Sequence, residues 1–317
     1  MDSFKRAGQA PKKYHIMMVL LVIVWGLELS VAKDALEYAN TFLILNVKYF
    51  IGALVITVVA WRTGQMHLPK LQDVPMLILT TFVGHIVYFY CEYSALATVP
   101  VANITIILGF LPIGTILVEK VLFHRRLSGK LIAFMCICVV GIFLVIGTDF
   151  SSMRGGSSGG YLMCLGILGS WLGYLFLTEG IAVKYGGIQI AFLQNWLAWF
   201  MTIPMVVPHL PELTHLPPKV TMELLYLGIV SEGLCFLAEI TGLEKLGSTI
   251  SAVYSNFLPV TSSLFGVILL GQDMVLLQYI GGAIVITTGF LVIREKERID
   301  MTGTSCIKRE ESTCGKN

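Results

Sequence analysis

Residues 110–112 read Phe-Leu-Pro and residues 143–146 read Phe-Leu-Val-Ile, and both sets recur in the same order 147 positions later. The later copies are residues 257–259 and residues 290–293. The whole stretch from about His85 to Ile146 is repeated weakly at this offset, which indicates an internal duplication. Both copies consist of long apolar segments, so we expect the repeated unit to lie in a membrane.

The amino-acid composition excludes an ordinary soluble protein. Of 317 residues, 56% are hydrophobic and only 13% are charged, and the mean hydropathy is +0.79. Soluble domains contain roughly 25% charged residues, so this chain has too few charges to cover its surface in water. The first apolar run, about residues 16–31, is interrupted by Trp25 and Glu28 and has no small-residue cleavage site. We therefore interpret it as a spanning helix and not as a signal peptide.

The apolar runs predict an all-α integral membrane protein with ten transmembrane helices. A helix needs about 20 apolar residues to cross the hydrocarbon core of a bilayer. Runs of that kind fall near residues 15–33, 42–61, 75–96, 99–122, 130–147, 161–181, 188–208, 222–242, 247–270 and 275–293.

A stretch rich in Gly and Ser lies at the midpoint and separates the ten runs into two sets of five. The expected organisation is a cytoplasmic N-terminal tail (1–14), a first repeat (15–147), the linker (148–160), a second repeat (161–293) and a charged cytoplasmic tail (294–317).

The Lys and Arg residues predict the orientation. With the N-terminus inside the cell, 18 of the 22 Lys and Arg residues fall on the inner side, three fall outside, and Lys48 lies within a span. Positive charge is enriched in cytoplasmic loops, so both termini are expected in the cytoplasm of a multi-pass cell-membrane protein (the plasma or inner membrane). An odd number of helices per repeat makes the second repeat enter the membrane in the opposite direction. The sequence therefore predicts two inverted five-helix repeats with a binding site between them near mid-depth.

Ionisable residues within the apolar runs are the main candidates for function, because a charge in the bilayer is costly. His85 and Glu92 are seven residues apart, so in an α-helix they share one face with Tyr88 between them. At the 147-residue offset His85 corresponds to Glu232 and Glu92 to Glu239. These positions predict two central polar groups and a carboxylate at each mouth of a transport pathway. The alternative is that they only join helices by hydrogen bonds.

Further polar and aromatic residues lie in the expected spans. Glu28 follows Trp25 by one helical turn, and Trp171 occupies nearly the same place in the sixth span. Lys48 lies in the second span, where Glu28 or Glu92 could neutralise it. It either forms a structural ion pair or contacts substrate. Asn256 precedes a proline of the ninth span by about one turn and is expected to face the site.

The embedded groups also predict the kind of cargo. Carboxylates removed from water bind protons more readily, so exchange of a proton for a cationic or zwitterionic substrate is expected. The embedded Glu residues outnumber the single Lys, which favours an amine-bearing substrate over a phosphate or an organic anion. The chain has no phosphate-binding Gly motif and no ATPase segment, which disfavours primary transport.

The motifs resemble those of the EamA-type family in the drug/metabolite transporter superfamily. The resemblance covers nearly the whole chain and depends on the order of several short motifs, which are residues 25–26 (Trp-Gly), 48–50 (Lys-Tyr-Phe), 93–96 (Tyr-Ser-Ala-Leu), 111–112 (Leu-Pro), 126–128 (Arg-Leu-Ser) and 258–259 (Leu-Pro). The family commonly has Gly-Glu before Arg-Leu-Ser, where this chain has His124 and Arg125. What the resemblance implies is a permease of two inverted five-helix repeats that moves small metabolites, often amino acids and often outward.

The leading interpretation is a secondary active transporter that exports an amino acid or another amine-bearing metabolite by alternating access, with protons as the coupling ion. A facilitative uniporter and an intramembrane enzyme using His85 and Glu92 are the alternatives. The expected partners are a small-molecule substrate, the lipid bilayer and protons. We expect no nucleic acid, no metal and no cofactor, and the chain would act as a monomer or homodimer.

Overall fold

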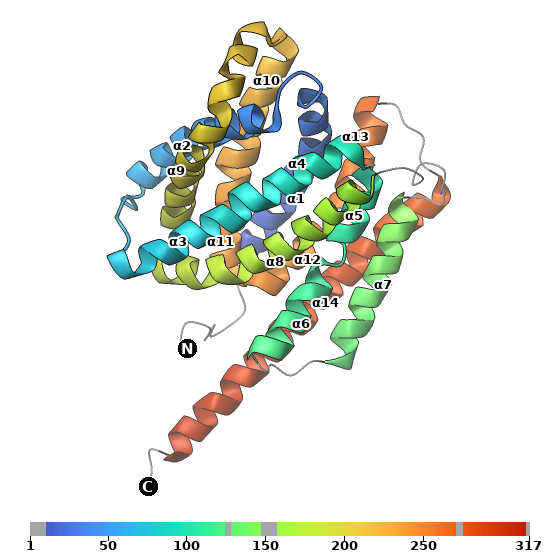
Figure 1. Ribbon diagram of the computed structural model, residues 1–317. Helices are drawn as coiled ribbons and strands as arrows, with labels where there is room; N and C mark the ends of the chain where they lie inside the picture. The colour runs from blue at the N-terminus through green and yellow to red at the C-terminus, as the bar shows by residue number, and fades with distance from the viewer. Residues whose placement is uncertain (1–10, 100, 124–127, 147–156, 271–274, 315–317) are drawn as a thin grey trace.

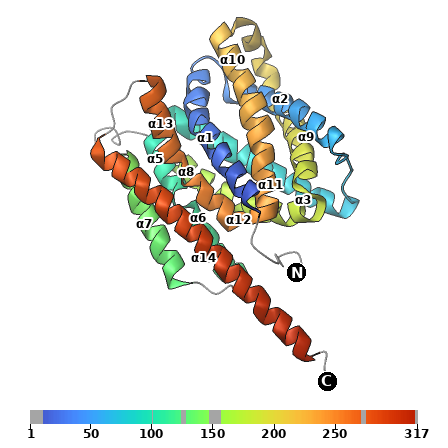
Figure 2. The same cartoon turned by 180° about the vertical axis from the view of Figure 1, so that it is seen from behind.

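The long apolar runs of the sequence form a bundle of helices. The computed structural model describes residues 11–99, 101–123, 128–146, 157–270 and 275–314. Figures 1 and 2 show the helices of both halves of the chain interleaved in one body. The first half contains α1 (Lys12–Ala35), α2 (Thr41–Arg62), η2 (Leu71–Asp73), α3 (Val74–Thr81), η3 (Phe82–Val87), α4 (Tyr88–Thr98), α5 (Val101–Leu108), α6 (Leu111–Phe123) and α7 (Gly129–Ile146).

The second half repeats this order. It contains α8 (Ser158–Tyr185), α9 (Gly187–Val206), η4 (Val207–His215), α10 (Pro218–Tyr226), η5 (Leu227–Cys235), α11 (Phe236–Leu246), α12 (Ser248–Ser255), α13 (Leu258–Leu270) and α14 (Leu276–Cys314). The short elements η2 and η4 are 3-10 helices, whereas η3 and η5 are π-helical segments.

Seven helices in the described ranges are long and apolar enough to cross a membrane, which supports an all-helical membrane protein but does not confirm the predicted count of ten spans. α7 is a shorter apolar helix. The fourth and ninth expected spans are each divided into two short helices, α5 with α6 and α12 with α13. The prediction of ten spans in two inverted repeats therefore stays a prediction.

Prolines explain where the fourth and ninth expected spans divide. Pro112 and Pro259 stand in the first turn of α6 and α13, directly after turns at residues 109–110 and 256–257. Proline lacks the N–H that continues a helical ladder but fits the first turn of a new helix.

Contacts between the two halves of the chain hold the bundle together. α2 packs along α9 and η5, and α1 packs along α13 and α11. α7 and α14 lie side by side, and the C-terminal part of α14 extends beyond the bundle in both views (Figures 1 and 2). The segment from residue 294 is thus a continuation of α14 as far as Cys314.

Glycine and short polar residues set the turns. Asn40 accepts a hydrogen bond from the N–H of Phe42 at the start of α2 (2.9 Å), which satisfies one of the free donors at a helix N-terminus. Gly186 and Gly247 connect α8 to α9 and α11 to α12 with φ angles of 93° and 91°. These angles lie in a region that side chains disfavour.

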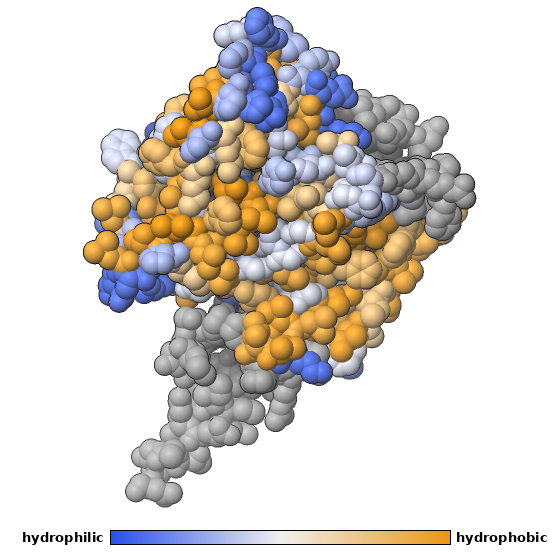
Figure 3. Space-filling model, viewed as in Figure 1, coloured by the Kyte–Doolittle hydropathy of each residue, from blue (hydrophilic) through white to orange (hydrophobic). Residues whose placement is uncertain are grey.

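The surface of the protein exposes many apolar side chains, as expected for a protein surrounded by lipid. Large hydrophobic side chains such as Leu20, Phe200 and Ile268 are more than half exposed. In Figure 3 they form a broad hydrophobic region across the middle, with hydrophilic residues at the upper end and the lower left edge. A soluble protein does not expose apolar area on this scale, whereas a membrane protein covers it with lipid.

Candidate functional site

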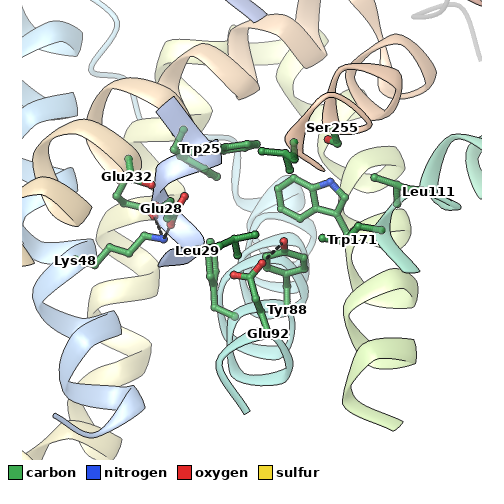
Figure 4. Close-up of a pocket in the computed structure, with 15 residues that line it drawn as sticks. Trp25, Glu28, Leu29, Lys48, Tyr88, Glu92, Leu111, Trp171, Glu232 and Ser255 are labelled. Atoms are coloured by element: carbon green, nitrogen blue, oxygen red, sulfur yellow. Dashed lines mark hydrogen bonds and ion pairs between the residues drawn. The ribbon is translucent and has the colours of Figure 1, made fainter. Parts of the chain in front are cut away.

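A cavity lies inside the bundle and is lined by residues from both halves of the chain (Figure 4). Its volume of about 50 Å³ leaves room for a few water molecules. Seven of the ten residues predicted for the site line it: Trp25, Glu28, Lys48, Tyr88, Glu92, Trp171 and Glu232. Residues that are far apart in the sequence therefore meet around one space.

One side of the cavity carries buried charges of both signs. The Nζ atom of Lys48, on α2, lies 2.7 Å from Oε1 of Glu28 on α1 and 3.4 Å from Oε2 of Glu232 on η5. It also lies 3.9 Å from the centre of the Phe89 ring, a distance at which a cation is attracted by an aromatic face. The Lys48 side chain is only 1% exposed. Of the two neutralising partners considered from sequence, the structure selects Glu28 and not Glu92.

Aromatic rings and a fourth ionisable residue form the other walls. The hydroxyl of Tyr88 donates a hydrogen bond to Oε1 of Glu92 (2.8 Å). The ring of Trp171 lies 4.5 Å from that of Tyr88 and 6.4 Å from that of Trp25, measured between centroids. Glu92 is therefore held by a neutral donor, with a tryptophan on either side of the space (Figure 4).

His85 lies behind this cavity and not on its wall. Its ring is fully buried and packs against Phe236 (4.8 Å between centroids) and Tyr49 (5.4 Å). Its Nε2 atom lies 3.8 Å from Oε1 of Glu232, too far for a good hydrogen bond. The hydroxyl of Tyr49 donates to the backbone carbonyl of His85 at 2.5 Å.

The expected common face of His85, Tyr88 and Glu92 differs from the structure for a physical reason. η3, the π-helical segment that contains His85, ends just before Tyr88. A π-helix places more residues in each turn than an α-helix, so it shifts the direction of side chains on either side of it. Tyr88 and Glu92 line the cavity, while His85 does not.

The two π-helical segments occupy corresponding positions in the repeats. Residues 82–87 of η3 correspond to residues 229–234 at the 147-residue offset, and these lie inside η5. His85 is in the first and Glu232 in the second. Such segments are frequent at functional sites, and no pattern in the sequence predicted them.

Two predicted residues lie away from the cavity. Glu239 is on α11, 1% exposed, and does not line the space. The side-chain N–H of Asn256 points to the sulfur of Cys138 on α7 (3.6 Å), although its neighbour Ser255 lines the cavity.

Other lining residues were not anticipated from the sequence. They are mostly apolar: Leu29, Phe89, Leu108, Leu111, Ser231, Phe236, Ser255 and Leu258. Their neighbours supply the signal that would have found several of them, since Ser231 precedes Glu232, and Leu111 and Leu258 precede the two helix-starting prolines.

The sequence as a whole identifies the family. Residues 12–147 and 157–294 each match the model of the EamA-like transporter family. The chain belongs to the EamA-like transporter family. Each of the two matches covers one half of this EamA-like transporter, in agreement with the repeat read from the sequence.

Relatives of this EamA-like chain are named as transporters, exporters or efflux pumps. It is 21% identical over 300 residues to a probable terminal-alkyne amino-acid exporter of Streptantibioticus cattleyicolor, with 94% of this chain and 97% of the relative covered. It is also 21% identical over 302 residues to a probable amino-acid metabolite efflux pump of Salmonella typhimurium, with coverage of 89% and 94%.

A solved crystal structure has a similar fold. It superimposes with a TM-score of 0.68 at 17% identity and covers 87% of this chain and 96% of its own. Family membership and the candidate spans together show a multi-pass membrane transporter.

Proposed function

We propose that this transporter exports an amino acid or a related amine-bearing metabolite by alternating access, with the cavity as its substrate site. The observation that carries the proposal is a buried lysine between two carboxylates in a cavity that a third carboxylate also lines. Charges of both signs are costly inside apolar helices, and their usual role there is to meet a polar substrate or an ion.

The charge pattern favours a zwitterion or an amine. Glu92 accepts one hydrogen bond from Tyr88 and has no cation as close as the one at Glu28, so an ammonium group fits beside it. Trp25 and Trp171 offer aromatic faces that attract a cation. The carboxylate of an amino acid would compete with Glu232 for Lys48, whose longer contact of 3.4 Å is the weaker of its two ion pairs.

The small volume of the cavity is the one expected for an occluded or narrow state of the transporter. Space for a few water molecules is too small for most metabolites, so binding requires the walls to separate. Helices α1 and α2 of one half face η5 of the other half across this space. A relative movement of the halves, as in transporters with inverted repeats, would widen the cavity first toward one side of the membrane and then toward the other.

The direction of transport is proposed from the relatives. Of the two relatives described above, one is named as an exporter and the other as an efflux pump.

Counterflow in proteoliposomes tests this function. Vesicles loaded with an unlabelled amino acid are expected to take up the labelled form when the purified transporter is present. Glu232→Gln should abolish this uptake, because it removes a charge that lines the cavity. Glu244→Gln is the matched control, since Glu244 pairs with Lys245 near the end of α11, away from the cavity. Lack of exchange for a broad panel of amino acids and amines would show that the substrate class is wrong.

A further inference from the structure

Glu239 is a buried carboxyl group without a partner. It is 1% exposed, and neither of its oxygen atoms has a hydrogen-bond partner in the described residues. The elements that pack against α11 are α1, α8, α9, α12 and η5. From these elements, Tyr174 of α8 is a titratable side chain that interacts electrostatically with Glu239.

The other carboxyl groups of the site are compensated. Glu28 and Glu232 share Lys48, and Glu92 accepts a hydrogen bond from Tyr88. At the repeat offset, Tyr88 corresponds to Cys235, so Glu239 lacks the donor that Glu92 has. The second copy of the motif thus keeps the carboxyl group and loses its tyrosine.

An ionised carboxylate cannot remain in such a place. Burial of an isolated charge in an apolar interior costs far more than binding of a proton. Glu239 therefore carries a proton in this conformation, or holds a small cation in its place.

Other buried polar groups also lack partners, and two of them, Ser231 and Glu232, line the cavity. Both ring nitrogens of His85, Oγ of Ser231, Oδ1 of Asn195 and Oε1 of Glu232 have no hydrogen-bond partner in the described part of the chain. The Tyr174 ring lies 6.0 Å from the His85 ring between centroids, and Phe236 packs on His85 one turn before Glu239. These groups offer unused hydrogen-bond donors and acceptors beside the cavity.

We propose that Glu239 is a proton-binding site separate from the metabolite cavity, and that its proton couples transport to the proton gradient. The carboxyl O–H forms from a proton that enters from the cavity, past Glu232, His85 and Tyr174. When the opposite side opens, the O–H bond breaks and the proton passes to water beyond Glu239. No electron transfer is involved. The coupling role rests on the proposed transport function, whereas the protonated state of Glu239 does not.

Glu239→Gln separates coupling from substrate binding, because glutamine keeps the shape and cannot exchange the proton. In proteoliposomes at equal pH on both sides, this variant should exchange labelled amino acid at the wild-type rate. A pH gradient should drive net movement of the amino acid and proton entry, read by a trapped pH-sensitive dye, only in the wild type. Glu244→Gln should behave like the wild type. Gradient-driven movement that persists in Glu239→Gln would overturn the proposal, and so would loss of exchange together with coupling.

Infrared spectroscopy detects the proton on Glu239 without a transport assay. The wild type at neutral pH should show the C=O band of a protonated carboxyl group, which disappears in Glu239→Gln and remains in Glu244→Gln. If the Gln variant does not fold, Glu239→Asp should shift this band. No protonated-carboxyl band in the wild type, or dependence on sodium in place of protons, would overturn the proposal. A band at Glu239 in a protein that exchanges no amino acid would refute the proposed function and leave the proton site standing.

Discussion

Replacement of Lys48 by methionine tests whether the charged cluster of the cavity acts as one unit. Methionine fills a similar volume but leaves Glu28 and Glu232 without a cation in a place where Lys48 is 1% exposed. Loss of one partner from a buried ion pair costs roughly 3 to 5 kcal/mol of unfolding free energy. An ordinary interhelical hydrogen bond between membrane helices contributes only about 0.6 kcal/mol. A buried charged cluster and an ordinary interhelical hydrogen bond therefore predict clearly different losses of stability.

The destabilisation of Lys48→Met should also depend on pH. Without the lysine, the buried carboxyl group of Glu232 has no cation beside it in the folded protein, which favours its uncharged form there, whereas in the unfolded chain water hydrates the charged form. The folded variant then binds more protons than the unfolded one, so its stability falls as pH rises. The loss relative to the wild type should be larger at about pH 8 than at about pH 5.

Equilibrium unfolding in a mild detergent, followed by tryptophan fluorescence, measures both effects. A triple variant that adds Glu28→Gln and Glu232→Gln to Lys48→Met should recover most of the stability, because no charge is then left unpaired. Lys219→Met is the control, since Lys219 pairs with Asp34 at the exposed surface and should change little. A small loss that is the same at both pH values and is not recovered in the triple variant would refute this account of the cluster.

Three further substitutions test the packing around the site. Gly84→Ala places a Cβ atom 2.1 Å from the Tyr174 ring. Overpacking should therefore lower the free energy of unfolding by about 1 to 3 kcal/mol. The control is Gly169→Ala, whose Cβ atom meets nothing within 4 Å and which should unfold like the wild type. Tyr49→Phe removes the hydrogen bond to the backbone carbonyl in η3 and should cost about 1 kcal/mol in the same assay; an unchanged midpoint would show that η3 does not need this bond. Asn40→Ala removes the cap of α2 and should cost about 0.5 to 2 kcal/mol, with counterflow at the wild-type rate as the check that the site is intact.

The sequence anticipated one contact of the charged cluster, between Lys48 and one of two candidate carboxylates, because such a contact depends on residue type and depth. It did not anticipate Glu232 as a partner of Lys48. An ionisable residue in an apolar run has few places to go other than the interior of the bundle. Glu28, Lys48 and Glu232 come from three different spans, and the structure brings them within ion-pair distance. The repeat offset then marked Glu92 and Glu239 as a related pair.

The course of the backbone within a span could not be read from the residues. The expectation that His85 shares a face with Glu92 assumed a regular α-helix, and η3 shifts the register between them. Apolar composition is the same for α-helical and π-helical turns, so only the packed neighbours decide between the two. The divided spans had a partial signal in Pro112 and Pro259, but a proline inside an apolar run predicts a kink as readily as a complete break.

Each π-helical segment places one more residue in its turn than an α-helix would, at a position in the span next to the cavity. Conversion of one such turn to regular α-helix would rotate the part of the helix beyond it by about 100° and advance it by about 1.5 Å. Spin labels on α3 and α4 would report this as a changed distance between the two ends of one helix. A rotation of this kind would move Glu92 of α4 relative to the part of the span that precedes η3. Conversion of the equivalent turn in η5 would rotate Glu239 in the same way, so each half of the protein contains one helical turn about which part of a span can rotate.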